Sequence, residues 1–160
     1  MISQTVEYAL RASVALANRR DQPCTIQQLA AITEVPAAYL AKLMQRLVRC
    51  KLVISKRGLH GGLQLAKAPK DVTIWDIVEA IEPFERIREC PLKIASHGAT
   101  LCPLHRRLDD ALATVEKSLR NTTLAELLKT ANDKPPLCSR GSAAVVNISL
   151  PLKPRQRKRR

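Results

Sequence analysis

The feature that most constrains the fold is a series of three helical segments followed at once by two short β-prone runs. Apolar residues recur at helical spacing from Val6 to Ala17, and Asp21-Gln22-Pro23 ends that segment. Thr25 followed by Gln28 is a capping-box pair, which predicts a second helix. Pro36 is placed to open a third helix, whose apolar stripe is Leu40, Leu43, Met44, Leu47 and Val48.

The two β-prone runs cover residues 52–55 and 63–66. Between them lies Lys56-Arg57-Gly58-Leu59-His60-Gly61-Gly62, and its glycines suit a tight connection, so the two runs are predicted to form a hairpin. Three helices and then a hairpin is the order of a winged helix-turn-helix. The predicted fold is therefore mainly α, a winged helix-turn-helix with a small β-hairpin wing.

The second half of the chain predicts three more helices. Thr73 caps one that Pro83 ends, and an irregular stretch covers residues 85–101. Thr123 with Glu126 caps a last short helix. Between them, Pro103 opens a long helix ended by Asn121, and its apolar residues approximate a heptad seam: Leu104, Leu108, Ala111, Val115 and Leu119. We expect this helix to pair with its copy in a homodimer, the alternative being that it folds back onto its own domain.

These patterns divide the chain into four parts. Residues 1–83 are predicted to form a DNA-binding winged helix-turn-helix domain, and residues 84–102 a sensing or ligand loop. Residues 103–131 hold the dimerisation helix and the short terminal helix. Residues 132–160 include LPLKPRQRKRR and show no helical period, so we expect a disordered basic tail.

The charge of the chain indicates a polyanionic partner. It has 27 Lys+Arg against 14 Asp+Glu, a formal net charge of +13, which favours nucleic acid first and an anionic membrane second. Residues 35–70 contain eight basic residues and no acidic one, although folded surfaces normally mix both signs. We therefore expect this stretch to face double-stranded DNA.

The candidate DNA contacts follow from the predicted motif. The second helix of a helix-turn-helix enters the major groove with its N-terminal end, where small alanines allow close approach and free amides bind phosphate. Arginine at a wing tip suits a minor groove. The predicted contacts are Thr25, Pro36, Ala37, Ala38, Tyr39, Lys42, Arg46, Arg49, Lys56, Arg57, Gly58, His60 and Gly61.

Other classes of protein fit the sequence less well. No run of apolar residues is long enough for a spanning helix, and MISQTVEYAL lacks the basic start of a secretory signal, so we expect a cytoplasmic protein without a membrane partner. No phosphate loop, G-x-S-x-G or nucleophile with paired carboxylates is present, so neither an enzyme nor a small-molecule substrate is expected. Two Tyr, one Phe and one Trp are few aromatic rings for a protein that binds RNA by base stacking. A basic nucleic-acid-binding protein without a sensing function remains an open alternative.

The cysteines indicate reduced thiols or ligands, because five is an odd number in a chain without an export signal. Cys90, Cys102 and His105 are spaced C-x11-C-x2-H and form a reasonable soft-metal set. Cys24 and Cys50 lie on or beside helical apolar faces and are expected to be buried as small hydrophobes. Cys138, in the tail, is expected to be exposed.

Five segments of the chain carry a family resemblance. They are EYALRA at 7–12, TIQQLA at 25–30, VPAAYLAKLMQRL at 35–47, SKRGLHGGLQLAK at 55–67 and TLAELL at 123–128. With them the chain resembles the IscR/NsrR (Rrf-two) family of winged-helix transcription regulators, from Met1 to about Leu128. The RGxxGG wing and TLAELL are its more specific motifs. The resemblance implies a homodimer, held by the long helix, that binds a palindromic operator. It also implies that an iron–sulfur cluster is present in many members and alters DNA affinity.

The resemblance also implies a ligand set. In the family, three loop cysteines usually bind the cluster and a fourth ligand comes from elsewhere. Cys90 and Cys102 match the first and third cysteines, His105 matches the histidine of the IscR branch, and Glu7 matches the acidic residue that the NsrR branch donates from the partner's first helix. Ser96-His97 stands where the middle cysteine would be.

Three interpretations of this loop stay open. One is a cluster with mixed Cys, His and Glu ligands, which would suit the 2Fe-2S type. The second is a redox switch of Cys90 and Cys102 without metal, and the third is a decayed site.

The expected function is a dimeric, sequence-specific DNA-binding transcription regulator that senses iron–sulfur, redox or nitric oxide status. The loop joins the winged helix to the dimer helix, so a change there would alter the separation of the two recognition helices.

Overall fold

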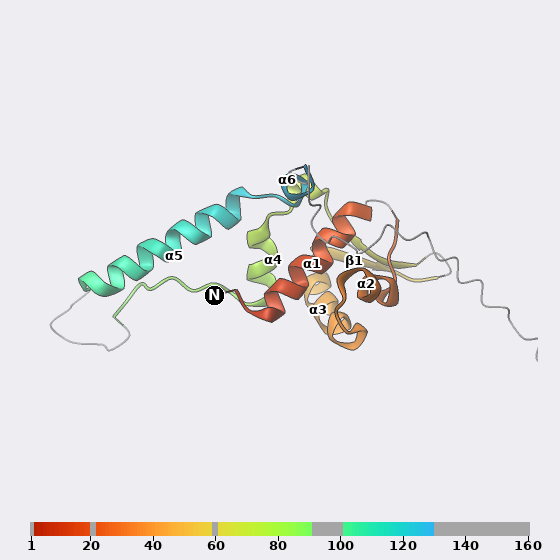
Figure 1. Ribbon diagram of the computed structural model, residues 1–160, viewed down its shortest axis with the longest axis horizontal. Coiled ribbons are helices and arrows are strands. Elements are labelled where there is room, and N and C mark those ends of the chain that lie inside the picture. The colour runs from red at the N-terminus through yellow and green to blue at the C-terminus, as the bar shows by residue number, and fades with distance from the viewer. Residues whose placement is uncertain (1, 20–21, 59–60, 91–100, 130–160) are drawn as a thin grey trace, which may run out of the picture.

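The structure is a computed structural model that describes residues 2–19, 22–58, 61–90 and 101–129. The described part is helical apart from one two-stranded antiparallel sheet, which confirms the predicted fold class. The elements, shown in Figure 1, are α1 (Gln4–Arg19), α2 (Ile26–Thr33), α3 (Ala37–Arg49), β1 (Val53–Lys56), β2 (Gly62–Leu65), the 3-10 helix η1 (Pro69–Asp71), α4 (Ile74–Ile81), α5 (Pro103–Asn121) and α6 (Leu124–Lys129).

Helix α1 is the centre of the winged-helix unit. It packs against α2, α3, α4, α6 and β2, and in Figure 1 it lies between α6 and α3. Small residues on its buried face, Ala9, Ala12 and Ala17, have no exposed surface. Because they carry only a methyl group, helices on several sides can approach the α1 backbone closely. The core around it is filled mainly by Leu16, Leu29, Leu40, Leu47 and Ile77.

The helix-turn-helix motif begins at the predicted capping box. The Thr25 hydroxyl accepts from the Gln28 amide at 3.2 Å, and the Gln28 side-chain oxygen accepts from the Thr25 amide at 2.9 Å. Glu34 ends α2 in the left-handed region, with φ 55°. Pro36 (φ −54°, ψ 132°) is the N-cap of α3 rather than its first helical residue, one position from the prediction.

The end of α3 explains why one cysteine prediction is wrong. Cys50 is exposed, not buried. Lys51 adopts φ 57°, the Leu52 amide donates to the Leu47 carbonyl at 2.9 Å, and the Lys51 amide donates to the Val48 carbonyl at 3.0 Å. This pattern is a Schellman motif. It turns the chain after Cys50, so Leu52 enters the core while the thiol stays in solvent.

The wing is attached to the segment that precedes α2. Strands β1 and β2 pair from Val53↔Leu65 to Lys56↔Gly62, each displaced by one residue from its predicted run. Cys24 exchanges two backbone hydrogen bonds with Leu63, at 3.0 and 2.8 Å. A Cβ on Gly62 would lie 2.9 Å from the Cys24 backbone, so a glycine is required there. Cys24 is buried as predicted, and burial raises the pKa of its thiol.

Helices α5 and α6 differ in how they meet this unit. α5 extends away from it and contacts mainly α4, and none of its residues is buried (Figure 1). α6 returns to the core: Leu124 is fully buried and its amide donates to the Val72 carbonyl at 2.9 Å. The terminal helix, grouped with α5 by sequence, thus packs with the winged helix. No helix in the described part of the chain is both long and apolar enough to cross a membrane.

Candidate nucleic-acid interface and sensing loop

One face of α3 carries five of the thirteen predicted DNA contacts. Leu40, Leu43, Met44 and Leu47 point into the core, and the opposite side of the helix is exposed. The exposed positions recur at helical spacing and are Ala38, Tyr39, Lys42, Gln45, Arg46 and Arg49. Gln45 was not among the predicted contacts, although its position three residues after Lys42 could have indicated it.

The first turn of α3 is held against α1. The Tyr39 hydroxyl lies 2.9 Å from the Thr5 hydroxyl oxygen, and its ring meets the Tyr8 ring edge to face, with centroids 5.8 Å apart. Gln4 donates to the Tyr8 hydroxyl at 2.7 Å. Tyr39 therefore positions the start of α3, in addition to any contact with DNA. Pro36 and Ala38 beside it are exposed, and Ala37 is half-buried.

The wing tip presents cations beside a compact turn. Lys56, Arg57 and Gly58 are exposed, and the Gly61 amide donates to the Gly58 carbonyl at 2.9 Å. A Cβ on Gly61 would clash with the Lys56 carbonyl oxygen, so the turn closes only around a glycine. Thr25 is exposed at the start of α2, where its hydroxyl is the helix cap. His60 lies outside the described residues.

The predicted ligand set is brought together only in part. Cys102 is the N-cap of α5, and its Sγ lies 3.3 Å from His105 Nδ1. Cys90 is buried, with 7% of its surface exposed. Glu7 forms an ion pair with Arg11, with Nε and Oε1 2.5 Å apart. Among residues 2–19, 22–58, 61–90 and 101–129, no three His, Cys, Asp or Glu side chains are grouped so as to hold a metal ion. Residues 91–100, with Ser96-His97, and the tail with Cys138 lie outside the described residues.

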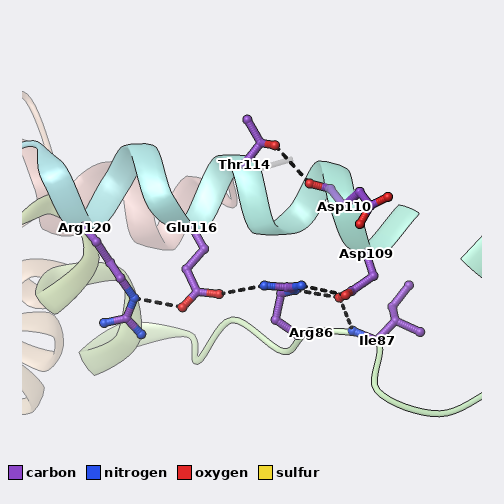
Figure 2. Close-up of polar contacts among 7 residues, drawn as sticks. All are labelled: Arg86, Ile87, Asp109, Asp110, Thr114, Glu116 and Arg120. Atoms are coloured by element: carbon purple, nitrogen blue, oxygen red, sulfur yellow. Dashed lines mark hydrogen bonds and ion pairs between the residues drawn. The ribbon is translucent and has the colours of Figure 1, made fainter. Parts of the chain in front are cut away.

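The segment after α4 is tied to α5 by an ionic network that sequence analysis did not predict. The Arg86 guanidinium donates to both carboxylate oxygens of Asp109, each at 2.6 Å, and the Ile87 amide donates to Asp109 at 3.0 Å (Figure 2). Glu116 lies 3.5 Å from Arg86 and 2.8 Å from Arg120. The Arg120 guanidinium stacks 4.1 Å above the Trp75 ring of α4. The network therefore joins α4, the segment that follows it and α5.

The network shifts the titration of its carboxylates. Hydrogen bonds from Arg86 lower the pKa of Asp109 from the ordinary value of 3.8, and hydrogen bonds from Arg120 lower that of Glu116 from 4.5. The same contacts raise the pKa of Arg86, led by its bond to Asp109. Because the folded pKa values of both acids are depressed, their stabilising contribution is complete above about pH 4.5 and is lost as the pH falls through the folded values.

The lowered pKa values of Asp109 and Glu116 predict how the stability of an Arg86 variant changes with pH. Arg86→Gln should lower the melting temperature by about 3 °C at pH 7, since it removes a partly exposed bidentate pair. The difference from wild type should shrink towards zero as the pH falls through the lowered pKa values of Asp109 and Glu116, because both carboxylates then become protonated in either protein. Calorimetry from pH 7 down to the acid limit of the folded protein measures this difference, with Arg107→Gln on the exposed side of α5 as the control. A difference that does not change with pH would contradict the assignment.

Comparison of the sequence with known protein families identifies the family of this chain. A family model described as Rrf2, iron-dependent transcriptional regulator, matches residues 2–130 of the chain. The chain belongs to the Rrf2 family. This confirms the Rrf-two resemblance found in its motifs. This chain is also 31% identical, over 131 residues, to a candidate HTH-type transcriptional regulator of Aquifex aeolicus (strain VF5). The match covers 80% of this chain and 91% of the relative.

Solved structures of Rrf2 proteins have the same fold. CymR (YrzC), the global cysteine regulator of B. subtilis, matches with a TM-score of 0.69 and 26% identity, covering 81% of this chain and 97% of that one. IscR of T. potens matches with a TM-score of 0.69 and 26% identity, covering 82% and 88%. The oxidised form of Staphylococcus aureus CymR matches with a TM-score of 0.59 and 29% identity, covering 79% of this chain and 94% of that one. This Rrf2 protein is a transcriptional regulator with a DNA-binding winged helix, and not an enzyme.

Proposed function

We propose that this Rrf2 protein is a homodimer that binds a palindromic operator and senses redox or iron–sulfur status through the loop 84–102 and the start of α5. The observation that carries the dimer is the apolar seam of α5. Leu104, Leu108 and Val115 are 64%, 48% and 43% exposed. A row of large apolar side chains at heptad-like spacing is the pattern of a helix that pairs with another helix.

The surroundings of the seam support the same arrangement. A hollow of about 480 Å³ lies between the start of α1, the end of α4 and α5, with Val115 and Leu119 on its α5 side. Ile2, also at its edge, is 55% exposed. Pairing of two α5 helices would cover this apolar surface. It would also set the distance between two α3 helices, which must match half-sites about one helical turn of DNA apart.

The proposed sensing element is the pair of Cys102 and His105. A thiol that lies 3.3 Å from an imidazole nitrogen at the start of α5 brings two predicted ligands together. Thiolate with imidazole is a donor set that 2Fe-2S clusters accept. The pair thus fits half of a cluster site, which Cys90 and Glu7 would complete. A bound cluster would supply an electron-accepting group whose loss changes the charge and shape of the loop.

A thiol switch without metal is the second candidate. Cys90 and Cys102 are both free thiols, and a solved relative, Staphylococcus aureus CymR, exists in an oxidised form. Hydrogen peroxide would accept two electrons and two protons from the two thiols, giving one disulfide and two water molecules. Either chemistry would act on the segment that Arg86 ties to α5.

Replacing Cys102 tests the sensing element. Operator affinity of the wild-type protein should change at least about tenfold between anaerobic and peroxide-treated samples, and Cys102→Ala should abolish this response. Cys50→Ala is the matched control, because it removes an exposed thiol at the end of α3 and should respond like wild type. Fluorescence anisotropy with a labelled operator duplex measures each affinity. An equal response in Cys102→Ala and wild type would contradict the sensing role.

Iron and sulfide analysis separates the two chemistries. Protein purified without oxygen should contain iron and acid-labile sulfide and absorb visible light if the cluster is present, and Cys102→Ala should lose all three. Colourless, iron-free wild type that still responds to peroxide would assign the thiol switch. Colourless protein with no response would leave the loop without a sensing role.

A further inference from the structure

A groove on the far side of the winged helix from α3 is not used by the proposed function. It has a volume of about 730 Å³, and η1, α6, β2 and the end of α1 enclose it. In Figure 1, α6 lies on the opposite side of α1 from α3. The lining residues are Leu16, Leu65, Lys67, Ala68, Pro69, Lys70, Ala125, Leu128 and Lys129. Such a volume is in the range of small-molecule sites rather than of protein interfaces.

The groove combines an apolar floor with a cationic rim. Leu16 is buried at its base, and Leu65, Ala125 and Leu128 are half-buried around it. Lys67, Lys70 and Lys129 are all exposed. None of the described residues that line it is acidic, so no lining carboxylate neutralises the three ammonium groups.

The walls of the groove are held in place by backbone hydrogen bonds. The Ala66 amide donates to the Leu52 carbonyl and the Leu124 amide to the Val72 carbonyl, each at 2.9 Å. The Asp71 amide closes η1 by donating to the Ala68 carbonyl at 2.8 Å. A ligand entering this groove therefore orders little of the chain, which favours binding because less conformational entropy is lost.

We propose that this groove binds a small amphipathic carboxylate, with an apolar chain or ring against Leu65 and Leu128 and the carboxylate among the three lysines. The charge complementarity carries the assignment: an apolar surface alone would accept neutral ligands, and lysines alone would accept any anion. Lys67 and Lys70 belong to the acid-free stretch of residues 35–70. They follow β2 in the chain and do not belong to α3.

The position of the groove gives the ligand a route to the rest of the molecule. The lysines at 67 and 70 follow directly from the wing, and α6 follows directly from α5. A bound carboxylate would thus bridge the segment leaving the wing and the helix that follows α5. If its affinity differs between free and DNA-bound protein, linkage requires DNA affinity to change by the same factor.

Calorimetric titration of the full-length protein with decanoate tests the site. We expect one decanoate per chain, with decanol binding at least about tenfold more weakly because it lacks the charge. Lys67→Gln with Lys70→Gln should weaken decanoate at least about tenfold, whereas the matched double variant Lys51→Gln with Lys117→Gln should not. Ala125→Phe, which keeps all three lysines and fills the groove, should also abolish binding.

The remaining outcomes would overturn the proposal. Equal affinity for decanol and decanoate would make the groove a non-specific apolar surface. Unchanged decanoate binding in both the Lys67/Lys70 double variant and Ala125→Phe would place the ligand elsewhere. A loss of duplex DNA affinity in the double variant, with decanoate binding intact, would assign these lysines to phosphate contacts. Circular dichroism checks folding, and the titration contains no DNA, so its result is independent of the proposed regulatory function.

Discussion

Replacing both Lys42 and Arg57 by alanine is expected to reduce affinity for a specific duplex about 100-fold. Lys42 lies on the exposed face of α3, and Arg57 is an exposed residue of the wing, so we expect the two residues to contact different grooves. In the proposed dimer the double variant removes four contacts, and a loss of about threefold for each gives about 100-fold; the salt dependence of binding should fall by about one unit of slope for each lost phosphate contact. Fluorescence anisotropy at several salt concentrations measures both, with a duplex that the wild-type protein has selected from a random pool.

The matched control replaces cations that lie off this face. Arg107→Ala with Lys117→Ala removes the same charge from α5, and both side chains are exposed. If net charge alone drives binding, the two double variants will lose the same affinity. That result would contradict a defined interface and would support a basic protein that binds nucleic acid without sequence preference.

Leu108→Asp should convert the protein to monomers and reduce binding to the selected palindromic duplex by about 100-fold or more. The Leu108 side chain is already 48% exposed in one chain, so the substitution costs the isolated chain little. In a paired helix it would place one carboxylate against its copy in an apolar seam, where burial of an unpaired charge is strongly unfavourable. Sedimentation velocity measures the mass, and anisotropy measures the affinity.

Arg106→Asp is the control for that substitution. It introduces the same residue two positions earlier, which is on the other side of the helix, and Arg106 is exposed. It should leave the mass of the particle at that of a dimer. A Leu108→Asp protein that remains dimeric would show that the seam is not the interface, whereas a wild-type monomer would remove the basis of the proposed operator binding.

Local sequence signals were sufficient to predict the elements that carry the DNA-binding face. Capping boxes at Thr25 and Thr73, the proline at Pro103 and the glycine-rich turn before Gly62 mark the starts and turns. These signals act over three or four residues, so their physical cause lies within the sequence window that reveals it. The boundaries differ from the structure by about one residue, as at Pro36, because the φ angle that the proline ring fixes suits either the N-cap or the first helical position.

Contacts between segments that are distant in the sequence could not be predicted from such local signals. Arg86 meets Asp109 across 23 residues of sequence, and the pairing of Thr73 with Thr123 brings α6 onto the winged helix. The exposure of Cys50 was also not predicted, because the Schellman turn at Lys51, and not the apolar stripe of the helix, decides which side chains enter the core.

The order of helices, the wing and the acid-free stretch from 35 to 70 were determined by the sequence alone, because each depends on neighbours along the chain. Only the tertiary structure decided which faces remain open. It left the α5 seam exposed, set Cys102 beside His105, and joined Lys67, Lys70 and Lys129 around one groove. Exposure and proximity depend on how the helices pack around α1, and that packing is a property of the whole set of core side chains.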